Sequence, residues 1–153
     1  MRVEQPLESA QMRTLNKLLI AGALVFGAFS TQADDPSVIC LAKNIYYEAQ
    51  GESLIGKLAV AKVTLNRVAS PKFPNSVCGV VYQKYQFSWT LTKQYKIRNL
   101  AAWQESLNLA RDAIYNGLPE LENFKALYFH NKQVNPRWNR KRLLKIGNHI
   151  FYG

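Results

Sequence analysis

Apolar residues recur at helical spacing soon after residue 33. The first stripe has members three or four positions apart, at Val38, Leu41, Ala42, Ile45 and Ala49. Asp35-Pro36 suits the start of this helix, because Asp accepts hydrogen bonds from free N–H groups and Pro fits the first turn. Gly51 suits its end.

Three more helical segments are expected. The second helix runs from about Ser53 to Val68, with a stripe at Leu58, Ala61, Leu65 and Val68. Prolines at 71 and 74 interrupt it. Asn75 or Ser76 is expected to cap a short helix through Val77, Val80 and Val81. A fourth helix has its stripe at Trp103, Leu107, Ala110 and Ile114 and stops at Gly117.

The remaining segments lack helical periodicity. Residues 83–99 are irregular and rich in aromatic and polar side chains, which predicts a long loop or ribbon around a site. Residues 126–129 resemble a strand, Asn135-Pro136 a turn, and residues 146–151 a hairpin. A helical body with a small β element is an α+β domain.

The first 33 residues have the order of a secretory signal. Arg13 and Lys17 precede an apolar run over residues 18–29, and Thr31-Gln32-Ala33 offers small residues for cleavage. Met12 begins a more typical signal than Met1, and the alternative is an uncleaved anchor. We therefore expect export to the periplasm or cell envelope, and a single catalytic domain over residues 34–153.

The exported part is strongly basic. Residues 1–33 hold three basic and two acidic side chains, so residues 34–153 keep +9 of the chain's formal net charge of +10. Such a protein should be drawn to a polyanion. Nucleic acid is the usual candidate, but export favours anionic wall polymer or a membrane surface. The densest basic cluster is either a solvated face or a binding surface; it consists of Arg137, Arg140, Lys141, Arg142 and Lys145.

Both cysteines, Cys40 and Cys78, lie in the exported part. In an oxidising compartment they could form one disulfide, which would contribute roughly 3–4 kcal/mol in the chain-entropy model. The alternative is two buried free thiols. Two cysteines without a histidine spacing do not make a zinc site, so no metal or other cofactor is expected.

A candidate catalytic acid follows by elimination among the eight acidic residues of 34–153. Six have other assignments: Asp34 and Asp35 at the cleavage point and helix cap, Glu105 and Asp112 on a polar helix face, and Glu120 and Glu122 in a loop. Glu48 comes three residues after Ile45, beside the buried stripe, where desolvation raises a carboxyl pKa and keeps the acid protonated. The alternative is a structural carboxylate paired with Lys43 or a tyrosine. Glu52 suits the capping of Ser53 and its neighbours.

A single acid limits the chemistry of a glycosidase. Retaining and inverting glycosidases use two carboxylates, and only Glu52, four positions on, could be the second. With one acid, the carboxyl protonates the leaving oxygen. The resulting carboxylate then takes the proton of the substrate's own C6 hydroxyl as that group attacks C1. The product is a 1,6-anhydromuramic end, and no water is consumed.

The stretch from Cys40 to Glu52 is Cys-Leu-Ala-Lys-Asn-Ile-Tyr-Tyr-Glu-Ala-Gln-Gly-Glu. It resembles the opening signature of the spore-cortex-lytic cell-wall hydrolase family, of the SleB/CwlJ type. The likeness continues in order through Gly56, Ala59-Val60-Ala61, Leu65-Asn66-Arg67-Val68, Phe73-Pro74, residues 77–81, 86–89 and 126–130, Pro136-Arg137-Trp138 and residues 146–151. These blocks cover nearly all of residues 34–153.

The resemblance implies a lysozyme-like α+β fold and cleavage of muramic-acid glycan by a lytic transglycosylase, with Glu48 at the position of the family's catalytic glutamate. Gln50 occupies a position where an arginine is common in the family, so any role of that arginine is in doubt for this chain. Muramidase hydrolysis of the same bond is one alternative. A non-catalytic peptidoglycan-binding module is the other. The chain is similar to short members that have a signal and no separate wall-binding domain.

Side chains expected to bind the sugar comprise Tyr47, Glu52, Gln86, Ser88, Trp89, His130 and Trp138. For each aromatic residue the alternative is core packing, which is favoured for Tyr46. A structural role is favoured for His130, and His149 is expected to be structural. The expected partner is peptidoglycan, bound by a monomer. We expect no nucleic acid and no stable membrane association after the signal is removed.

Overall fold

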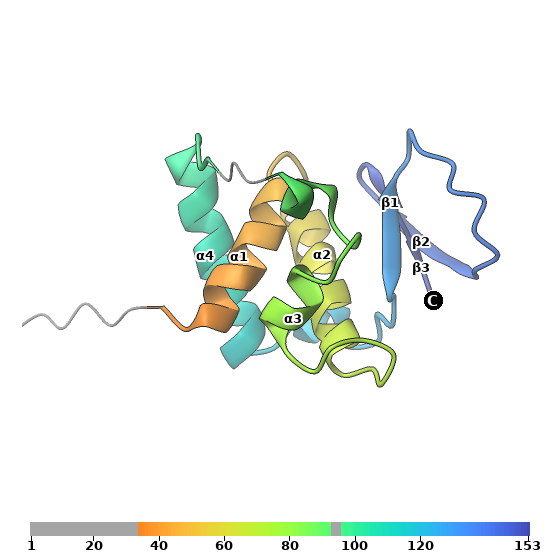
Figure 1. The fold of residues 1–153 in the computed structure, drawn as a ribbon, viewed down its shortest axis with the longest axis horizontal. Helices are drawn as coiled ribbons and strands as arrows, with labels where there is room; N and C mark the ends of the chain where they lie inside the picture. Colours follow the sequence, from red (N-terminus) through yellow and green to blue (C-terminus); the bar gives the residue numbers. More distant parts are fainter. Residues whose placement is uncertain (1–33, 93–95) are drawn as a thin grey trace, which may run out of the picture. The chain divides into compact units, whose positions relative to one another are not determined.

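The structure is a computed structural model that describes residues 34–92 and 96–153. Helix α1 (Pro36–Ala49) packs against α2 (Leu54–Val68), α3 (Val77–Val81) and α4 (Leu100–Tyr115). Figure 1 shows α1 between α4 and α2. The predicted signal peptide lies outside the described residues.

The start of α1 agrees with the prediction. Asp35 is the N-cap, and one of its side-chain oxygens accepts a hydrogen bond of 2.7 Å from the Ser37 amide. This bond stabilises the carboxylate and lowers the pKa of Asp35. The helix ends at Ala49, two residues before Gly51, and Gly51 does not adopt the left-handed conformation often found after a helix.

The other predicted helices are also present. Ser76 caps α3 by accepting from the Gly79 amide. Helix α4 begins after Asn99, whose side chain accepts from the Ala102 amide. It stops before Gly117, which has a φ of 77°. Glycine supplies this left-handed conformation without steric cost, so the predicted stop at Gly117 is confirmed.

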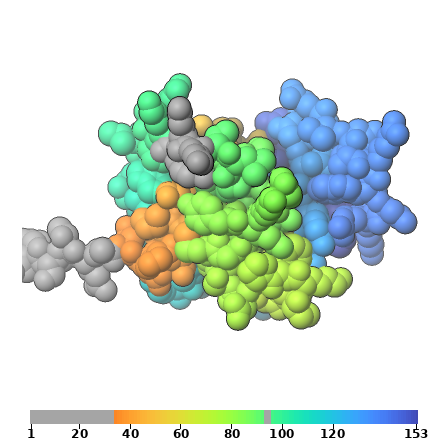
Figure 2. Space-filling view, viewed as in Figure 1, coloured from red at the N-terminus to blue at the C-terminus, as the bar shows by residue number. Residues whose placement is uncertain are grey.

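The β element is an antiparallel sheet in the order β1-β3-β2, drawn in blue in Figures 1 and 2. It consists of β1 (Tyr128–Asn131), β2 (Arg142–Ile146) and β3 (His149–Tyr152). The predicted hairpin is confirmed: Ile146 pairs with His149 across a two-residue turn. The strand predicted at 126–129 was placed two residues too early. The reason is that Ala126 is fully buried in the helical core, and the chain enters the sheet only after it.

The predicted irregular segment 83–99 contains one short 3-10 helix, η1 (Ser88–Leu91), and no other regular element among its described residues. A second 3-10 helix, η2 (Pro119–Leu121), follows α4. None of the described helices combines the length and the hydropathy that crossing a lipid bilayer requires.

Candidate active site

The end of α1, the face of α2, the segment around η1, and strands β1 and β3 enclose a cavity of about 550 Å³. Its lining combines one carboxylate, one guanidinium and two imidazoles with aromatic and amide side chains. The lining residues are Glu48, Arg67, Tyr85, Gln86, Phe87, Ser88, Leu91, Phe129, His130, Asn131, Val134 and His149.

Glu48 is the last residue but one of α1 and is partly buried. Burial disfavours the charged form and raises the pKa of Glu48 to about 7, while the positive charge of Arg67 acts in the opposite direction. A carboxyl group with this pKa is protonated in a large fraction of molecules at neutral pH. It can therefore give a proton to a group in the cavity.

Arg67 brings a buried positive charge to the same cavity. Its side chain comes from the last turn of α2 and is 4% exposed. Nε donates to the Leu127 carbonyl oxygen at 2.7 Å, and the guanidinium lies 5.2 Å from the ring centroid of Phe73 and 5.4 Å from that of Phe87. Among the described residues, Nη1 has no hydrogen-bond partner. Burial lowers the pKa of Arg67 to about 10, so the group stays charged at neutral pH.

Arg67 was not among the predicted site residues, although its spacing carries a signal. It follows Val60 by seven positions and Val63 by four, which places a cation on the buried face of α2. A buried cation is rare without a function or a partner.

The two histidines of the cavity differ in their surroundings. His149, from β3, is 4% exposed, and burial lowers its pKa. His130, from β1, lies with Nε2 2.9 Å from the Tyr152 hydroxyl and with Nδ1 2.8 Å from the Asn131 carbonyl oxygen. His149 therefore also lines the cavity, although only a structural role was expected for it.

The predicted sugar-binding residues divide into two groups. Gln86, Ser88 and His130 line the cavity with Glu48. Tyr47, Trp89, Trp138 and Glu52 are not in that lining among the described residues. The structure therefore places three of the seven predicted sugar-binding residues in the same cavity as Glu48.

Tyr47 and Trp89 form a stacked pair, with ring centroids 4.7 Å apart and planes 24° apart. The indole nitrogen of Trp89 donates to Asn44 at 3.4 Å, and the fully buried Asn44 in turn donates to Thr64 at 3.1 Å. This chain of contacts holds Trp89, in η1, against α1 and α2. Tyr47 also lines a second cavity of about 330 Å³.

Trp138 lies on the sheet side of the site and is 40% exposed. Its ring meets those of His130 and Tyr152 edge to face, with centroids 5.4 Å and 5.7 Å apart. The contact with His130 places an exposed aromatic face next to a residue of the cavity wall.

Glu52 does not cap α2 as expected, because its carboxylate is used by the β2–β3 turn. Oε2 accepts from the Asn148 amide at 3.1 Å, and Oε1 accepts from the Asn148 side chain at 2.9 Å. Nδ1 of His149 lies 4.0 Å from Oε1. Gly147 in this turn has a φ of 55°, a left-handed conformation that favours glycine, and a Cβ atom there would also meet the same carboxylate. Glu52 thus ties the hairpin that carries His149 to the helical body.

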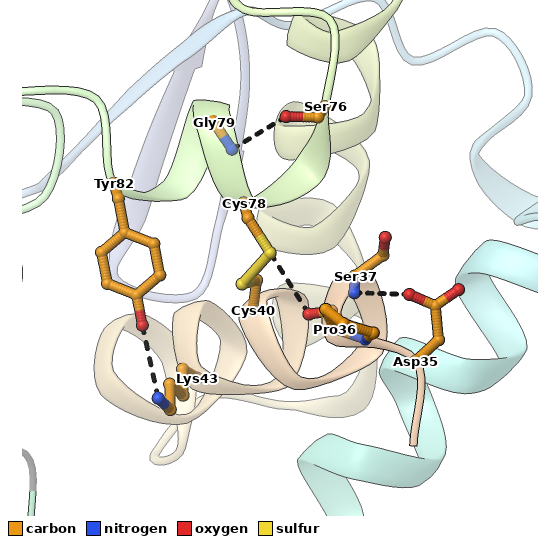
Figure 3. The surroundings of a disulfide bond; sticks show 9 residues. All are labelled: Asp35, Pro36, Ser37, Cys40, Lys43, Ser76, Cys78, Gly79 and Tyr82. Carbon is orange, nitrogen blue, oxygen red and sulfur yellow. Dashed lines mark hydrogen bonds between the residues drawn. A yellow bond between two sulfur atoms is a disulfide. The ribbon is translucent and has the colours of Figure 1, made fainter. Parts of the chain in front are cut away.

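Cys40 and Cys78 form a disulfide between α1 and α3, with Cα atoms 5.3 Å apart (Figure 3). The Cys78 sulfur also lies 3.3 Å from the Pro36 carbonyl oxygen, at the start of α1. The covalent bond fixes α3 against α1, the helix that carries Glu48. Among the described residues no cluster of three or more His, Cys, Asp or Glu side chains could hold a metal ion.

A family model described as Cell Wall Hydrolase matches residues 51–152, and the chain belongs to this family. The spore cortex-lytic enzyme of Bacillus subtilis is 37% identical over 114 residues, which are 72% of this chain and 35% of that protein. The enzyme of the same description from Bacillus cereus is 39% identical over 115 residues, which are 72% of this chain and 42% of that protein. The chain thus spans less than half the length of these relatives.

Solved structures confirm the fold. The catalytic domain of the germination-specific lytic transglycosylase SleB from Bacillus anthracis superposes with a TM-score of 0.65 at 32% identity, covering 80% of this chain and 98% of that chain. The SleB catalytic domain from Bacillus cereus gives 0.59 at 34% identity, covering 80% and 94%. The predicted family and the lysozyme-like α+β fold are therefore confirmed. The range matched by the family model begins after Glu48, and the role of that residue stays a prediction.

Proposed function

We propose that the protein cleaves the glycan strands of peptidoglycan between muramic acid and glucosamine, as a lytic transglycosylase. One observation carries the proposal: Glu48 is the single carboxylic side chain among the described residues that line the large cavity. Membership of the cell wall hydrolase family supports the substrate. The likeness to a domain described as a lytic transglycosylase supports the type of reaction.

The reaction needs one group that first donates and then accepts a proton. Protonated Glu48 donates its proton to the glycosidic oxygen as the bond to C1 of the muramic acid breaks. Its carboxylate then removes the proton of the C6 hydroxyl, whose oxygen bonds to C1 and closes the 1,6-anhydro ring. Glu48 ends protonated, and no water enters. A pKa of about 7 suits both steps near neutral pH.

A two-carboxylate mechanism finds little support in the geometry. Such a mechanism needs a second carboxylate at about 5–9 Å across the sugar from the first. Glu52 accepts two hydrogen bonds from Asn148 at the hairpin turn and is not in the cavity lining. We therefore assign Glu52 to the structure of the hairpin.

Other side chains would bind the sugars. Gln86, Ser88 and His130 offer hydrogen-bonding groups within the cavity, and the stacked rings of Tyr47 and Trp89 offer a flat apolar surface near the end of α1. We place the reaction in the cell envelope, since the predicted signal and the disulfide both suit an exported protein.

Mass spectrometry of fragments released from purified peptidoglycan tests the proposal. The protein should release muropeptides that are lighter by one water than the products of hydrolysis, and Glu48→Gln should release none while keeping its circular dichroism spectrum. Normal reducing ends would show muramidase action instead. If the unsubstituted protein binds peptidoglycan but releases no fragments, it is a binding module and the proposal is wrong.

A further inference from the structure

The C-terminal part of the chain carries most of the net positive charge, seven of the formal +10. Glu122 is the last acidic residue, and the 31 residues after it contain seven Lys or Arg side chains. Six of these follow β1 and are exposed; we call them the basic surface, and they are Lys132, Arg137, Arg140, Lys141, Arg142 and Lys145. They lie on strand β2 and on the loop before it, which Figure 1 shows on the side of the sheet away from α1 and α4.

The charge of the basic surface is not neutralised by acidic side chains in the described part of the chain. None of its six side chains forms an ion pair within residues 34–92 and 96–153. Arg140 lies over the ring of Tyr128, with 3.5 Å between the guanidinium carbon and the ring centroid, and 5.9 Å from the ring of Trp138. These unpaired cations beside an exposed indole are suited to an anionic partner that also has apolar parts.

The basic surface begins at the rim of the large cavity. Asn131 and Val134 both line the cavity, and exposed Lys132 lies between them in the chain. The Lys132 amide donates to the Asn148 carbonyl oxygen at 2.7 Å, and the Val134 amide donates to the Asn131 carbonyl oxygen at 2.9 Å. The rim is therefore fixed to the β2–β3 turn. Lys132, the first cation of the basic surface, thus lies where a polymer that enters the cavity would pass the rim.

We propose that the basic surface binds the free carboxylates of the peptides that branch from the glycan, so that the preferred substrate is peptide-bearing peptidoglycan. This inference rests on the proposed function. The peptides branch from muramic acid, close to the bond that is cut, and carboxylates match the unpaired lysines and arginines in charge. Because Lys132 lies at the rim, a bilayer seated on the basic surface would also cover the cavity, which disfavours anionic lipid as the occupant.

Co-sedimentation of the purified Glu48→Gln protein tests this proposal, because binding is measured without digestion. The ligands are insoluble peptidoglycan and the same glycan after an amidase has removed its peptides. The test variant adds Arg142→Gln and Lys145→Gln, both on exposed β2. The matched control adds Lys62→Gln and Lys72→Gln, which remove the same charge from α2 and the loop after it.

The test variant should bind peptide-bearing peptidoglycan about fivefold more weakly than its parent at low salt, with a smaller dependence on salt. Binding to peptide-free glycan, and both affinities of the control, should change less than twofold. An equal loss on both ligands, or an equal loss in the control, would overturn the proposal. So would a loss of binding to phosphatidylglycerol vesicles with none on peptidoglycan. Failure of the unsubstituted protein to cut glycan would refute the proposed function separately, since this assay requires no cleavage.

Discussion

Replacing Glu48 by glutamine should stabilise the protein while it removes activity, and the stabilisation should depend on pH. Burial raises the pKa of Glu48 from 4.5 to about 7, so the folded state holds this proton more tightly than the unfolded chain. The favourable contribution of protonated Glu48 to the free energy of unfolding is complete below pH 4.5 and is lost as the pH rises through about 7. Above that range the folded protein carries a partly buried charge at a cost.

The size of the cost follows from the shift in pKa. A shift from 4.5 to about 7 corresponds to about 3 kcal/mol once Glu48 is fully ionised. The side chain is only partly buried and faces a cavity that water can enter, so we expect about 1–2 kcal/mol. For a domain of this size that is a rise in melting temperature of about 3–8 °C for Glu48→Gln.

Thermal unfolding of Glu48→Gln and the unsubstituted protein, followed by circular dichroism between pH 4 and pH 8.5, measures this effect. The two melting temperatures should nearly coincide at pH 4 and separate as the pH rises through 7. Glu122→Gln is the matched control, because Glu122 is exposed, follows η2 and is not in the cavity lining. The Glu122→Gln substitution removes one negative charge, as Glu48→Gln does, but it removes this charge from an exposed carboxyl group.

A difference in melting temperature that stays constant from pH 4 to pH 8.5 would contradict the assignment. The same holds if Glu122→Gln shows an equal pH dependence, because the effect would then come from the net charge of the protein. Either result would mean that the Glu48 carboxyl is not desolvated in solution, and the single-acid mechanism would lose its physical basis.

Three further changes test the surroundings of the acid. Arg67→Met removes the cation that opposes the rise in the pKa of Glu48, so the alkaline limb of the pH–rate profile should move to higher pH, whereas Arg67→Lys should leave that limb in place. Glu52→Gln should cost about 1–2 kcal/mol of unfolding free energy by urea titration yet keep measurable glycan cleavage; complete loss of cleavage with an intact fold would make Glu52 a catalytic residue. Replacing Cys40 and Cys78 by serine should cost about 4 kcal/mol, because the bond closes a loop with a separation of 38 residues; an unchanged urea midpoint would contradict this.

Local spacing predicted the helices well. The apolar stripes of α1 and α4 are set by contacts three and four residues apart, which a sequence displays directly. Caps depend on residues equally close in the chain, as at Asp35 and Ser76. Strand β2 was predicted only at its end, because four of its five residues are exposed and give no alternation of apolar and polar positions.

The site was predicted only in part, because most of its contacts join residues that are far apart in the chain. Periodicity could place Glu48 beside a buried stripe, but it could not show which side chains from other elements face it. Arg67 comes from α2 and His149 from β3, and both reach the cavity through contacts across long stretches of chain. The capping role expected for Glu52 was wrong because the partner of its carboxylate, Asn148, is 96 residues away.

Three connections of this kind join segments that are far apart in the chain. The disulfide fixes α3 to α1, Arg67 binds the Leu127 carbonyl oxygen just before β1, and Glu52 binds the turn before β3. The last two join the helical body to β1 and to the β2–β3 turn, and β1 and β2 contain no fully buried residue. Apolar packing also positions the sheet, since Phe151 of β3 is fully buried in the core and Phe129 and Ile146 pack against it. Losing the Arg67 or the Glu52 contact should displace the sheet side of the cavity wall while the helices stay folded, so we expect Glu52 to influence the site although it does not line the cavity.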